Sequence, residues 1–353
     1  MATPDLLTPI VPDARLNRHF RFVATSPGYA PARPLLRDVW HEYVDRDGNF
    51  VEQFQTSGFD ARTWELFLFA FLHDDAQAEF EWDHAAPDFS VRIKGTHLYI
   101  EAVTANLSQL ENVVVHEART TDPVQQMHNL YPIRLGSALY SKLQKRYWDL
   151  PHVAGKPLVF TIQDFPEPES LYHSSASLWQ DLYGIRGSWY HDEVGRLHIE
   201  EISIDAHVHG SKRIPSRFFQ LPDADHVSAV LFGNSGTIAK FNRLGYLLGH
   251  GRKEVLKIIR RGLRYNHTPN STEPTFFAYA LDDADAPLER WSQGLTLFHN
   301  PKALHPLPYE ILSCAYGFMD NSVLRTFLPD FHPFVSQTVT LIAANKEIPE
   351  DPE

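Results

Sequence analysis

Two stretches of the sequence combine a helix with a strand that is apolar on both faces. The first places Pro157–Ile162 (PLVFTI) after a helical segment at 133–150, and the second places Val227–Phe232 before a helix at Thr237–Leu248. A strand without polar alternation is typical of a sheet that helices cover on both sides. Parallel neighbours in such a sheet need a crossover connection, usually a helix. The chain is therefore predicted to be an α/β protein.

A further helix and three short strands precede these units. The run Ala61–His73 is apolar nearly all round, which predicts a buried helix capped by Asp60. Short strands separated by turn residues are predicted at Ala78–Trp82, Asp88–Ile93 and His97–Val103. The first half of the chain thus reads as a helix, a meander, a second helix and a buried strand.

Changes in composition divide the 353 residues into four parts. Prolines interrupt residues 1–44, which are predicted to form an extended N-terminal arm. Residues 45–165 form the predicted core, and residues 166–345 form a predicted α/β extension that enlarges the sheet. Residues 346–353 are predicted to be a frayed acidic tail. A long polar stretch at 106–131 is predicted to be either a substrate-contacting lid or an ordinary surface insertion.

The composition also argues against several classes of protein. A formal net charge of −12 argues against general coating of nucleic acid. The longest apolar run, Leu66–Leu72, is far shorter than the roughly 20 residues that a transmembrane helix needs. Residues 1–15 lack the basic start and apolar stretch of a signal peptide, and the single Cys314 cannot form an internal disulfide. We therefore expect a cytoplasmic protein with no membrane segment.

Three acidic residues occupy positions where a charge is costly. Glu65 lies in the apolar helix, Asp88 begins a strand after Pro87, and Glu101 lies within the strand segment LYIEAV. If the two strands pair, the start of one faces the end of the other, which brings Asp88 beside Glu101. Adjacent carboxylates need a proton, a cationic partner or a metal ion, and oxygen ligands suit Mg²⁺ or Mn²⁺. Taken singly, Glu65 could be a salt-bridged helix residue and Asp88 a turn residue.

This order of residues resembles the PD-(D/E)XK nuclease superfamily. The core of that superfamily has an acid on a helix, then Pro-Asp in a meander, then acid-X-Lys on the next strand. Glu65, Pro87-Asp88 and Glu101-Ala102-Val103 match these places over roughly residues 50–165. The chain departs from the pattern at Val103, where the superfamily usually has lysine.

Some members of the superfamily supply this lysine from the following helix. In the segment 133–150, Lys142 falls about 60° from the centre of the apolar face and Lys145 about 120° away. Lys142 is therefore the predicted inward-facing lysine.

The resemblance implies a restriction-endonuclease-like core, a mixed sheet flanked by helices, with the second half as a C-terminal α/β elaboration. It implies a Mg²⁺-dependent or Mn²⁺-dependent endonuclease for DNA, acting in restriction, repair or defence against phage, as a homodimer or with a partner protein. Asp88 and Glu101 would hold the metal, Glu65 would complete its shell directly or through water, and Lys142 would assist the attacking water.

Two other functions remain open on the sequence alone. One is a catalytically inactive protein of the same fold that binds nucleic acid or a protein partner, because Val103 is also expected in an inactive relative. The other is a metal-dependent hydrolase of small phosphoesters, which would need a closed pocket instead of an open basic groove.

A cluster of basic residues stands out against the acidic composition. It follows the helix at 237–248 and is predicted to form a basic helix that tracks phosphates. The alternative is a solvated amphipathic helix. The predicted nucleic-acid contacts, two on the first helix and six after it, are Lys240, Arg243, Arg252, Lys253, Lys257, Arg260, Arg261 and Arg264.

Overall fold

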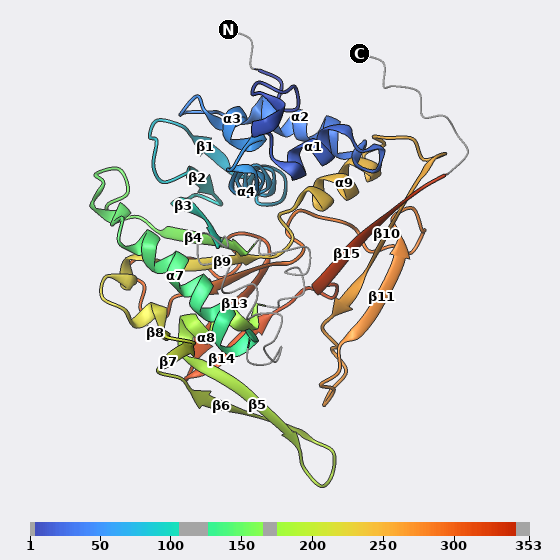
Figure 1. Cartoon of the computed structure of the whole chain (residues 1–353). Helices are drawn as coiled ribbons and strands as arrows, with labels where there is room; N and C mark the ends of the chain where they lie inside the picture. Colours follow the sequence, from blue (N-terminus) through green and yellow to red (C-terminus); the bar gives the residue numbers. More distant parts are fainter. Residues whose placement is uncertain (1–3, 106–125, 165–174, 344–353) are drawn as a thin grey trace.

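One mixed sheet of eight strands forms the centre of the molecule (Figure 1). The computed structural model describes residues 4–105, 126–164 and 175–343. In spatial order the strands are β1 (Glu79–Glu81), β2 (Phe89–Ile93), β3 (Thr96–Ala105), β4 (Leu158–Asp164), β9 (Ala229–Gly233), β12 (Leu295–His299), β13 (Ala315–Asp320) and β14 (Val323–Phe327). The pairs β3–β4, β4–β9 and β12–β13 are parallel, and the other neighbours are antiparallel. The prediction of an α/β protein with a mixed sheet is confirmed.

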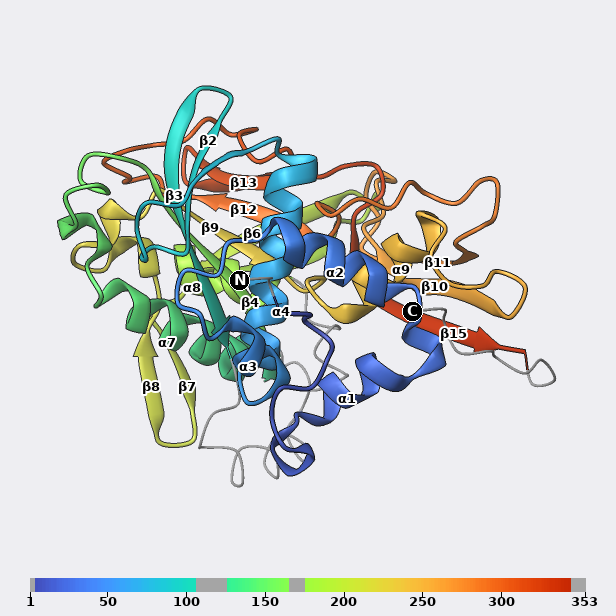
Figure 2. The same cartoon turned by 90° about the horizontal axis from the view of Figure 1, so that it is seen from above.

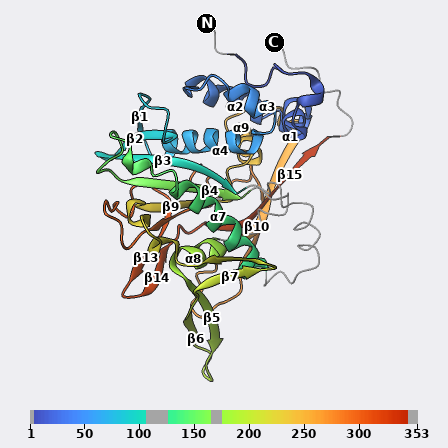
Figure 3. The same cartoon turned by 60° about the vertical axis from the view of Figure 1, so that its left-hand side comes forward.

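Helices cover both faces of this sheet (Figures 1 and 3). The helices are α1 (Arg18–Thr25), α2 (Ala32–Glu42), α3 (Phe50–Gln55), α4 (Phe59–Ala70), α7 (Tyr131–Leu143), α8 (Ala176–Tyr183) and α9 (Ile238–Leu247). The N-terminal helices and α4 lie over one face, and α7 and α8 lie over the other. Because β3 and β4 are covered on both sides, both of their faces are packed in apolar cores.

Successive residues of β3 alternate between the two cores. Leu98 and Ile100 pack with α4 on one side, whereas Tyr99 and Val103 pack with α7 on the other. Glu101 has the same parity as Tyr99 and Val103, because side chains alternate along a strand. Its side chain therefore points toward α7.

The central sheet crosses the boundary at residue 165 that composition suggested. β4, from the first half, pairs directly with β9, from the second. The segments 45–165 and 166–345 thus contribute strands to the same sheet, and the second half enlarges the sheet.

Three smaller sheets extend from the central one. A three-stranded sheet has the order β11 (Thr275–Ala280), β10 (Leu256–Arg264), β15 (Pro333–Ile342), and it lies to one side next to α9 (Figure 2). The hairpin of β5 (Ile185–His191) and β6 (Leu197–Ser203) projects from the body (Figure 1), and β7 (Ala206–His209) pairs with β8 (Lys212–Pro215).

The N-terminal segment is folded and packed, so the predicted extended arm at 1–44 is wrong. It contains α1 and α2, and Phe20, Leu36 and Trp40 are buried in the core. Asn242 of α9 donates a hydrogen bond of 2.9 Å to the carbonyl oxygen of Gly28. Prolines misled the prediction because they are tolerated in the first turn of a helix, and Pro34 lies in the first turn of α2.

The predicted basic helix at 252–264 is also wrong, because residues 256–264 form strand β10. Leu256, Ile258 and Arg260 are buried, whereas Lys257 and Arg261 are exposed. This alternation has the period of a strand. The alternation was not recognised in the sequence because Arg260, a charged residue, occupies one of the buried positions.

Smaller differences concern segment ends. The helix α4 begins at Phe59 with Gly58 at its N-cap, so Asp60 lies in the first turn and is not the cap. Most of the predicted loop at 106–131 and the acidic tail at 346–353 lie outside the described residues. Among the helices that are described, none combines the length and the apolar character needed to cross a membrane.

The close approach of α9 to the N-terminal segment predicts a large effect of a small substitution. A Cβ atom added at Gly245 would overlap the carbonyl oxygen of Pro31. Gly245→Ala is therefore expected to lower the free energy of unfolding by about 1–3 kcal/mol, measured by urea denaturation. Leu247→Ala, at an exposed position of the same helix, should change it by less than about 0.5 kcal/mol. Equal effects of the two substitutions would contradict the packing described here.

Candidate active site

The pairing of β2 with β3 places two acidic residues side by side. Phe89 pairs with Ile100, so Asp88 lies opposite Glu101. The backbone N–H of Asp88 donates to Glu101 Oε2 at 3.3 Å. The N–H of Ala102 in turn donates to Asp88 Oδ2 at 2.7 Å. Antiparallel register and two backbone hydrogen bonds thus fix the relative positions of the two carboxylates.

Two donors from the α7 side of the sheet converge on the Glu101 carboxylate. Lys142 Nζ lies 2.5 Å from Glu101 Oε1, and the hydroxyl of Tyr147 donates to the same oxygen at 2.7 Å. The Glu101 side chain is 5% exposed and that of Lys142 is 31% exposed, so solvent reaches the pair from the lysine side. Lys145, in contrast, is exposed and makes no contact with Glu101 in the described structure.

The usual lysine position, Val103, is filled by the apolar core. Val103 is buried in the same cluster as Leu139 of α7 and Ile162 of β4. A lysine there would have to enter the packed interface between β3 and α7, which is costly for a charged group. The ammonium group beside Glu101 comes from the helix instead.

Glu65 reaches the neighbourhood from α4, on the opposite face of the sheet from α7. Arg62 Nη1 lies 2.6 Å from Glu65 Oε2, and the hydroxyl of Tyr43 donates to that oxygen at 3.3 Å. Burial raises the pKa of Glu65 and the charge of Glu101 raises it further, while Arg62 and Tyr43 oppose the increase. The positive charge of Arg62 thus partly offsets the charge of Glu65 beside Glu101 and Asp88.

Asp88 is the acid for which the negative charge is most costly. Burial raises its pKa well above the usual value, and the charges of Glu101 and Glu65 raise it further. The hydrogen bond from Ala102 and the charge of Lys142 act in the opposite direction without cancelling the increase. A buried carboxyl group beside two other acids favours a proton or a bound cation.

The donor set fits a hard divalent cation held by two carboxylates. Mg²⁺ is commonly bound through one or two carboxylates, with water and substrate phosphate completing its shell. Asp88 and Glu101 could serve in this way. Among the residues that the structure describes, no three acidic, histidine or cysteine side chains are grouped closely enough to hold a metal by themselves. Because Glu65 is engaged by Arg62 and Tyr43, its contribution through a water molecule is more consistent with the geometry than a direct one.

Three residues of the site were not anticipated from the sequence. Tyr147 follows α7 in a short 3₁₀ turn, and no sequence pattern links it to Glu101. Tyr43 lies at the end of α2, in the segment that was expected to be extended. Arg62 had a usable signal, because it lies three residues before Glu65 in the same helix and such pairs lie on one face. Burial raises the pKa of Tyr43 and of Tyr147, so both phenols stay protonated donors.

Comparisons with protein-family models, with curated proteins and with solved structures find no match for this chain.

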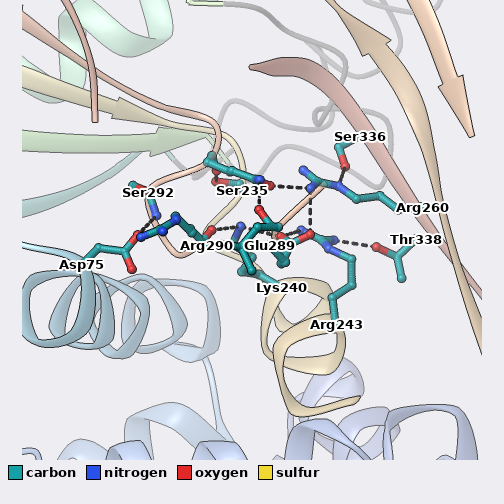
Figure 4. Close-up of polar contacts among 12 residues, drawn as sticks. Asp75, Ser235, Lys240, Arg243, Arg260, Glu289, Arg290, Ser292, Ser336 and Thr338 are labelled. Atoms are coloured by element: carbon teal, nitrogen blue, oxygen red, sulfur yellow. Dashed lines mark hydrogen bonds and ion pairs between the residues drawn. The ribbon is translucent and has the colours of Figure 1, made fainter. Parts of the chain in front are cut away.

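Three of the basic residues predicted to contact nucleic acid are buried instead around a single carboxylate (Figure 4). Lys240 Nζ lies 2.5 Å from Glu289 Oε1, Arg243 Nη2 lies 3.1 Å from the same oxygen, and Arg260 Nη1 lies 2.7 Å from Oε2. The prediction that Lys240, Arg243 and Arg260 form a DNA-binding surface is therefore wrong. They form an internal ion cluster that joins α9 to β10.

The same cluster extends to β15. Arg243 donates to Thr338 Oγ1 at 2.6 Å, and Arg260 donates to Ser336 Oγ at 2.9 Å. The guanidinium of Arg260 also lies 5.9 Å from the ring centre of Phe277 and 5.6 Å from that of Phe331. Aromatic contacts of this kind stabilise a desolvated cation. The cluster thus anchors the three-stranded sheet to the helix beside it.

The other five predicted contacts lie at or near the surface. Lys257 and Arg261 project from β10, and Arg252 and Lys253 precede it, all four exposed, while Arg264 at its end is half-buried. The Lys253 ammonium lies 5.3 Å from the ring centre of Tyr246.

The ion cluster predicts effects of very different size for two substitutions. Glu289→Gln would leave three buried cations without a counter-charge, and we expect it to lower the free energy of unfolding by about 3–5 kcal/mol. Lys240→Met removes the excess cation and leaves Glu289 with two arginines, so a change within about 1 kcal/mol is expected. Urea denaturation of both variants measures the difference. A smaller loss for Glu289→Gln than for Lys240→Met would contradict the assignment.

The protonation of Lys240 predicts a dependence of stability on pH. Burial, together with the charges of Arg243 and Arg260, lowers the pKa of Lys240 to about 7 against the attraction of Glu289. In the unfolded chain its pKa is near the ordinary value of 10.5. Between pH 7 and 10.5 the unfolded chain binds more protons, so the free energy of unfolding should increase with pH across this range. The increase should be smaller in Lys240→Met, and parallel profiles for the two proteins would refute this role.

Proposed function

We propose that this chain is a Mg²⁺-dependent or Mn²⁺-dependent nuclease that hydrolyses phosphodiester bonds of DNA. The observation that carries the proposal is the contact of Lys142 with Glu101 beside Asp88. It joins an ammonium group and two carboxylates in one partly accessible site, although they come from a helix, a strand and the segment just before another strand. An inactive scaffold has no need of this arrangement, because a buried acid could be replaced by an apolar residue at little cost.

The order of elements gives the proposal further support. The chain runs from α4 through β1, β2 and β3 to α7 and then to β4, which is parallel to β3. This is the order of helix, meander, helix and strand that the resemblance to the PD-(D/E)XK superfamily implies. The acids lie on α4, before β2 and on β3, as that order requires. A restriction-endonuclease-like core is therefore part of the proposal.

Each residue has a role that follows from its contacts. Asp88 and Glu101 would hold the divalent cation. When bound, the cation would lower the pKa of a water molecule and stabilise negative charge on the phosphate. Lys142, held by Glu101 at the solvent side, would orient the attacking water and stabilise charge that develops on the phosphate oxygens. Tyr147 fixes the Glu101 carboxylate through its hydrogen bond. Arg62 and Tyr43 orient Glu65 toward the same site.

The biological setting belongs to the same proposal. A cytoplasmic nuclease with this architecture would act in restriction, repair or defence against phage, as a homodimer or with a partner protein. The exposed basic residues of β10 and of the segment before it are the proposed contacts for the DNA backbone.

The proposal predicts that cleavage depends on the metal ion and on one lysine in particular. Glu101→Gln, Asp88→Asn and Lys142→Met should each lower the rate of DNA cleavage at least about 100-fold, because each removes charge or a donor at the reacting phosphate. Cleavage of linear, circular and single-stranded DNA would be measured with Mg²⁺ or Mn²⁺, and EDTA should abolish it.

Lys145→Met is the matched control, since it removes an exposed lysine from the end of the same helical segment. It should cleave at the rate of the unmodified protein. Cleavage that persists in Glu101→Gln, or equal losses in Lys142→Met and Lys145→Met, would refute the proposed site. DNA binding without any cleavage by the unmodified chain would favour the catalytically inactive alternative.

A further inference from the structure

The three-stranded sheet of β11, β10 and β15 has two faces of different character. The inner face carries Leu256, Ile258 and Arg260 of β10, and it packs against α9 through the ion cluster of Glu289. The outer face carries Lys257 and Arg261, both exposed. No helix covers this face in the part of the chain that the structure describes (Figures 1 and 2).

The outer face is both basic and apolar. Arg261 pairs with Ala278 of β11 and with Gln337 of β15, and the side chain of Gln337 accepts a hydrogen bond from Arg261 Nε at 3.1 Å. Leu263 pairs with Phe276, which is 65% exposed. At the other end Lys257 pairs with Leu341, which is 48% exposed. Cations and exposed apolar side chains therefore alternate across one surface.

Acidic residues are missing from these strands. None of β10, β11 and β15 contains aspartate or glutamate, although the chain as a whole has 44 acidic residues against 32 lysines and arginines. Asp282 and Asp283 follow β11 after one further residue and mark one limit of the surface. A ligand that matches this face must be anionic and must also offer apolar area.

We propose that this face binds single-stranded nucleic acid, with phosphates at Lys257 and Arg261 and a base stacked on Phe276. Single strands expose flat bases and phosphates together, and proteins bind them through basic surfaces that carry aromatic side chains. A duplex hides its bases and would leave the apolar side chains without a partner. Lys257 and Arg261 are four residues apart in a strand and thus about 13 Å apart along it. The sheet therefore contacts an extended strand at more than one phosphate.

This inference rests on the proposed nuclease function in one respect only. If the chain is a nuclease, binding at this sheet identifies single-stranded DNA as the form of DNA that it engages. Binding to the sheet does not itself require a metal or the Glu101 site. The two proposals can therefore fail separately.

The test is binding of a fluorescent oligothymidylate of about 20 nucleotides to the full chain in EDTA, followed by anisotropy over a range of salt concentrations. The double substitution Lys257→Glu and Arg261→Glu should weaken binding at least about ten-fold. It should also reduce the slope of log K against log salt by about 1.4, the value for two phosphate contacts on a single strand. Phe276→Ala should weaken binding about ten-fold.

Matched controls come from other exposed surfaces. Lys212→Glu with Arg213→Glu on β8 makes the same change of charge, and Phe327→Ala on β14 removes another exposed aromatic ring. Neither should alter binding by more than about two-fold. All substituted side chains are at the surface, and circular dichroism checks that each variant is folded.

Two results would overturn the inference: equal weakening by the β10 and β8 substitutions, or equally tight, Phe276-independent binding of a duplex of the same length. Glu101→Gln separates this proposal from the nuclease. If Glu101→Gln binds the oligonucleotide like the unmodified chain and neither protein cleaves DNA, the sheet surface stands and the nuclease does not. If cleavage needs Glu101 but binding does not depend on Lys257, Arg261 and Phe276, the nuclease proposal stands and the sheet surface does not.

Discussion

The parallel pairing of β3, β4 and β9 is the constraint on which the rest of the structure depends. These strands lie in the interior of the sheet, and β3 and β4 have apolar side chains on both faces. Such strands cannot face water on either side, so helices must pack over both. The connection from β3 to β4 supplies α7, and the N-terminal half supplies α4 and α2. The position of Lys142 follows from this requirement, because α7 lies over the face toward which Glu101 points.

Burial shifts the pKa values of two groups of charged residues in opposite directions. Around Glu289, three cations share one carboxylate, and burial lowers the pKa of Lys240. Around Glu101, three acids lie close together, and burial with the charges of Glu101 and Glu65 raises the pKa of Asp88. The first group is sealed within the protein and joins two parts of the fold. The second opens toward solvent at Lys142, so a ligand can reach its charged groups from that side. Access to solvent, more than charge, separates a structural cluster from a candidate site.

Local patterns in the sequence predicted those parts of the fold that depend on short-range periodicity. The strands β2, β3, β4 and β9 and the helices α4 and α9 were placed within a few residues, whereas α7 ends at Leu143 and not near residue 150 as predicted. The pairing of β2 with β3 then put Asp88 beside Glu101, and helix periodicity selected Lys142 over Lys145. The only tertiary relations that these inferences required were the pairing of β2 with β3 in a hairpin and the crossover from β3 through α7 to β4.

The missed features depend on long-range contacts that no local pattern contains. Arg260 has the sequence character of a surface residue, and its burial depends on distant partners that include Glu289, Phe277 and Phe331. Tyr147 contacts Glu101 because the chain turns back after α7. The prolines of the first 44 residues suggested an extended arm, but tertiary packing against α9 stabilises helices between them.

The alternation of arginines in β10 has a consequence for how this strand can pair. Arg260 and Arg261 are neighbours in sequence, yet one is locked into an internal ion cluster and the other faces solvent. A shift of the strand by one residue would exchange them and would also bury Lys257 while exposing Leu256 and Ile258. Each of these exchanges is unfavourable, so the three-stranded sheet has a single permitted alignment. The buried ion pair of Arg260 thus fixes the register of β10, and the register determines which side chains lie on the outer face.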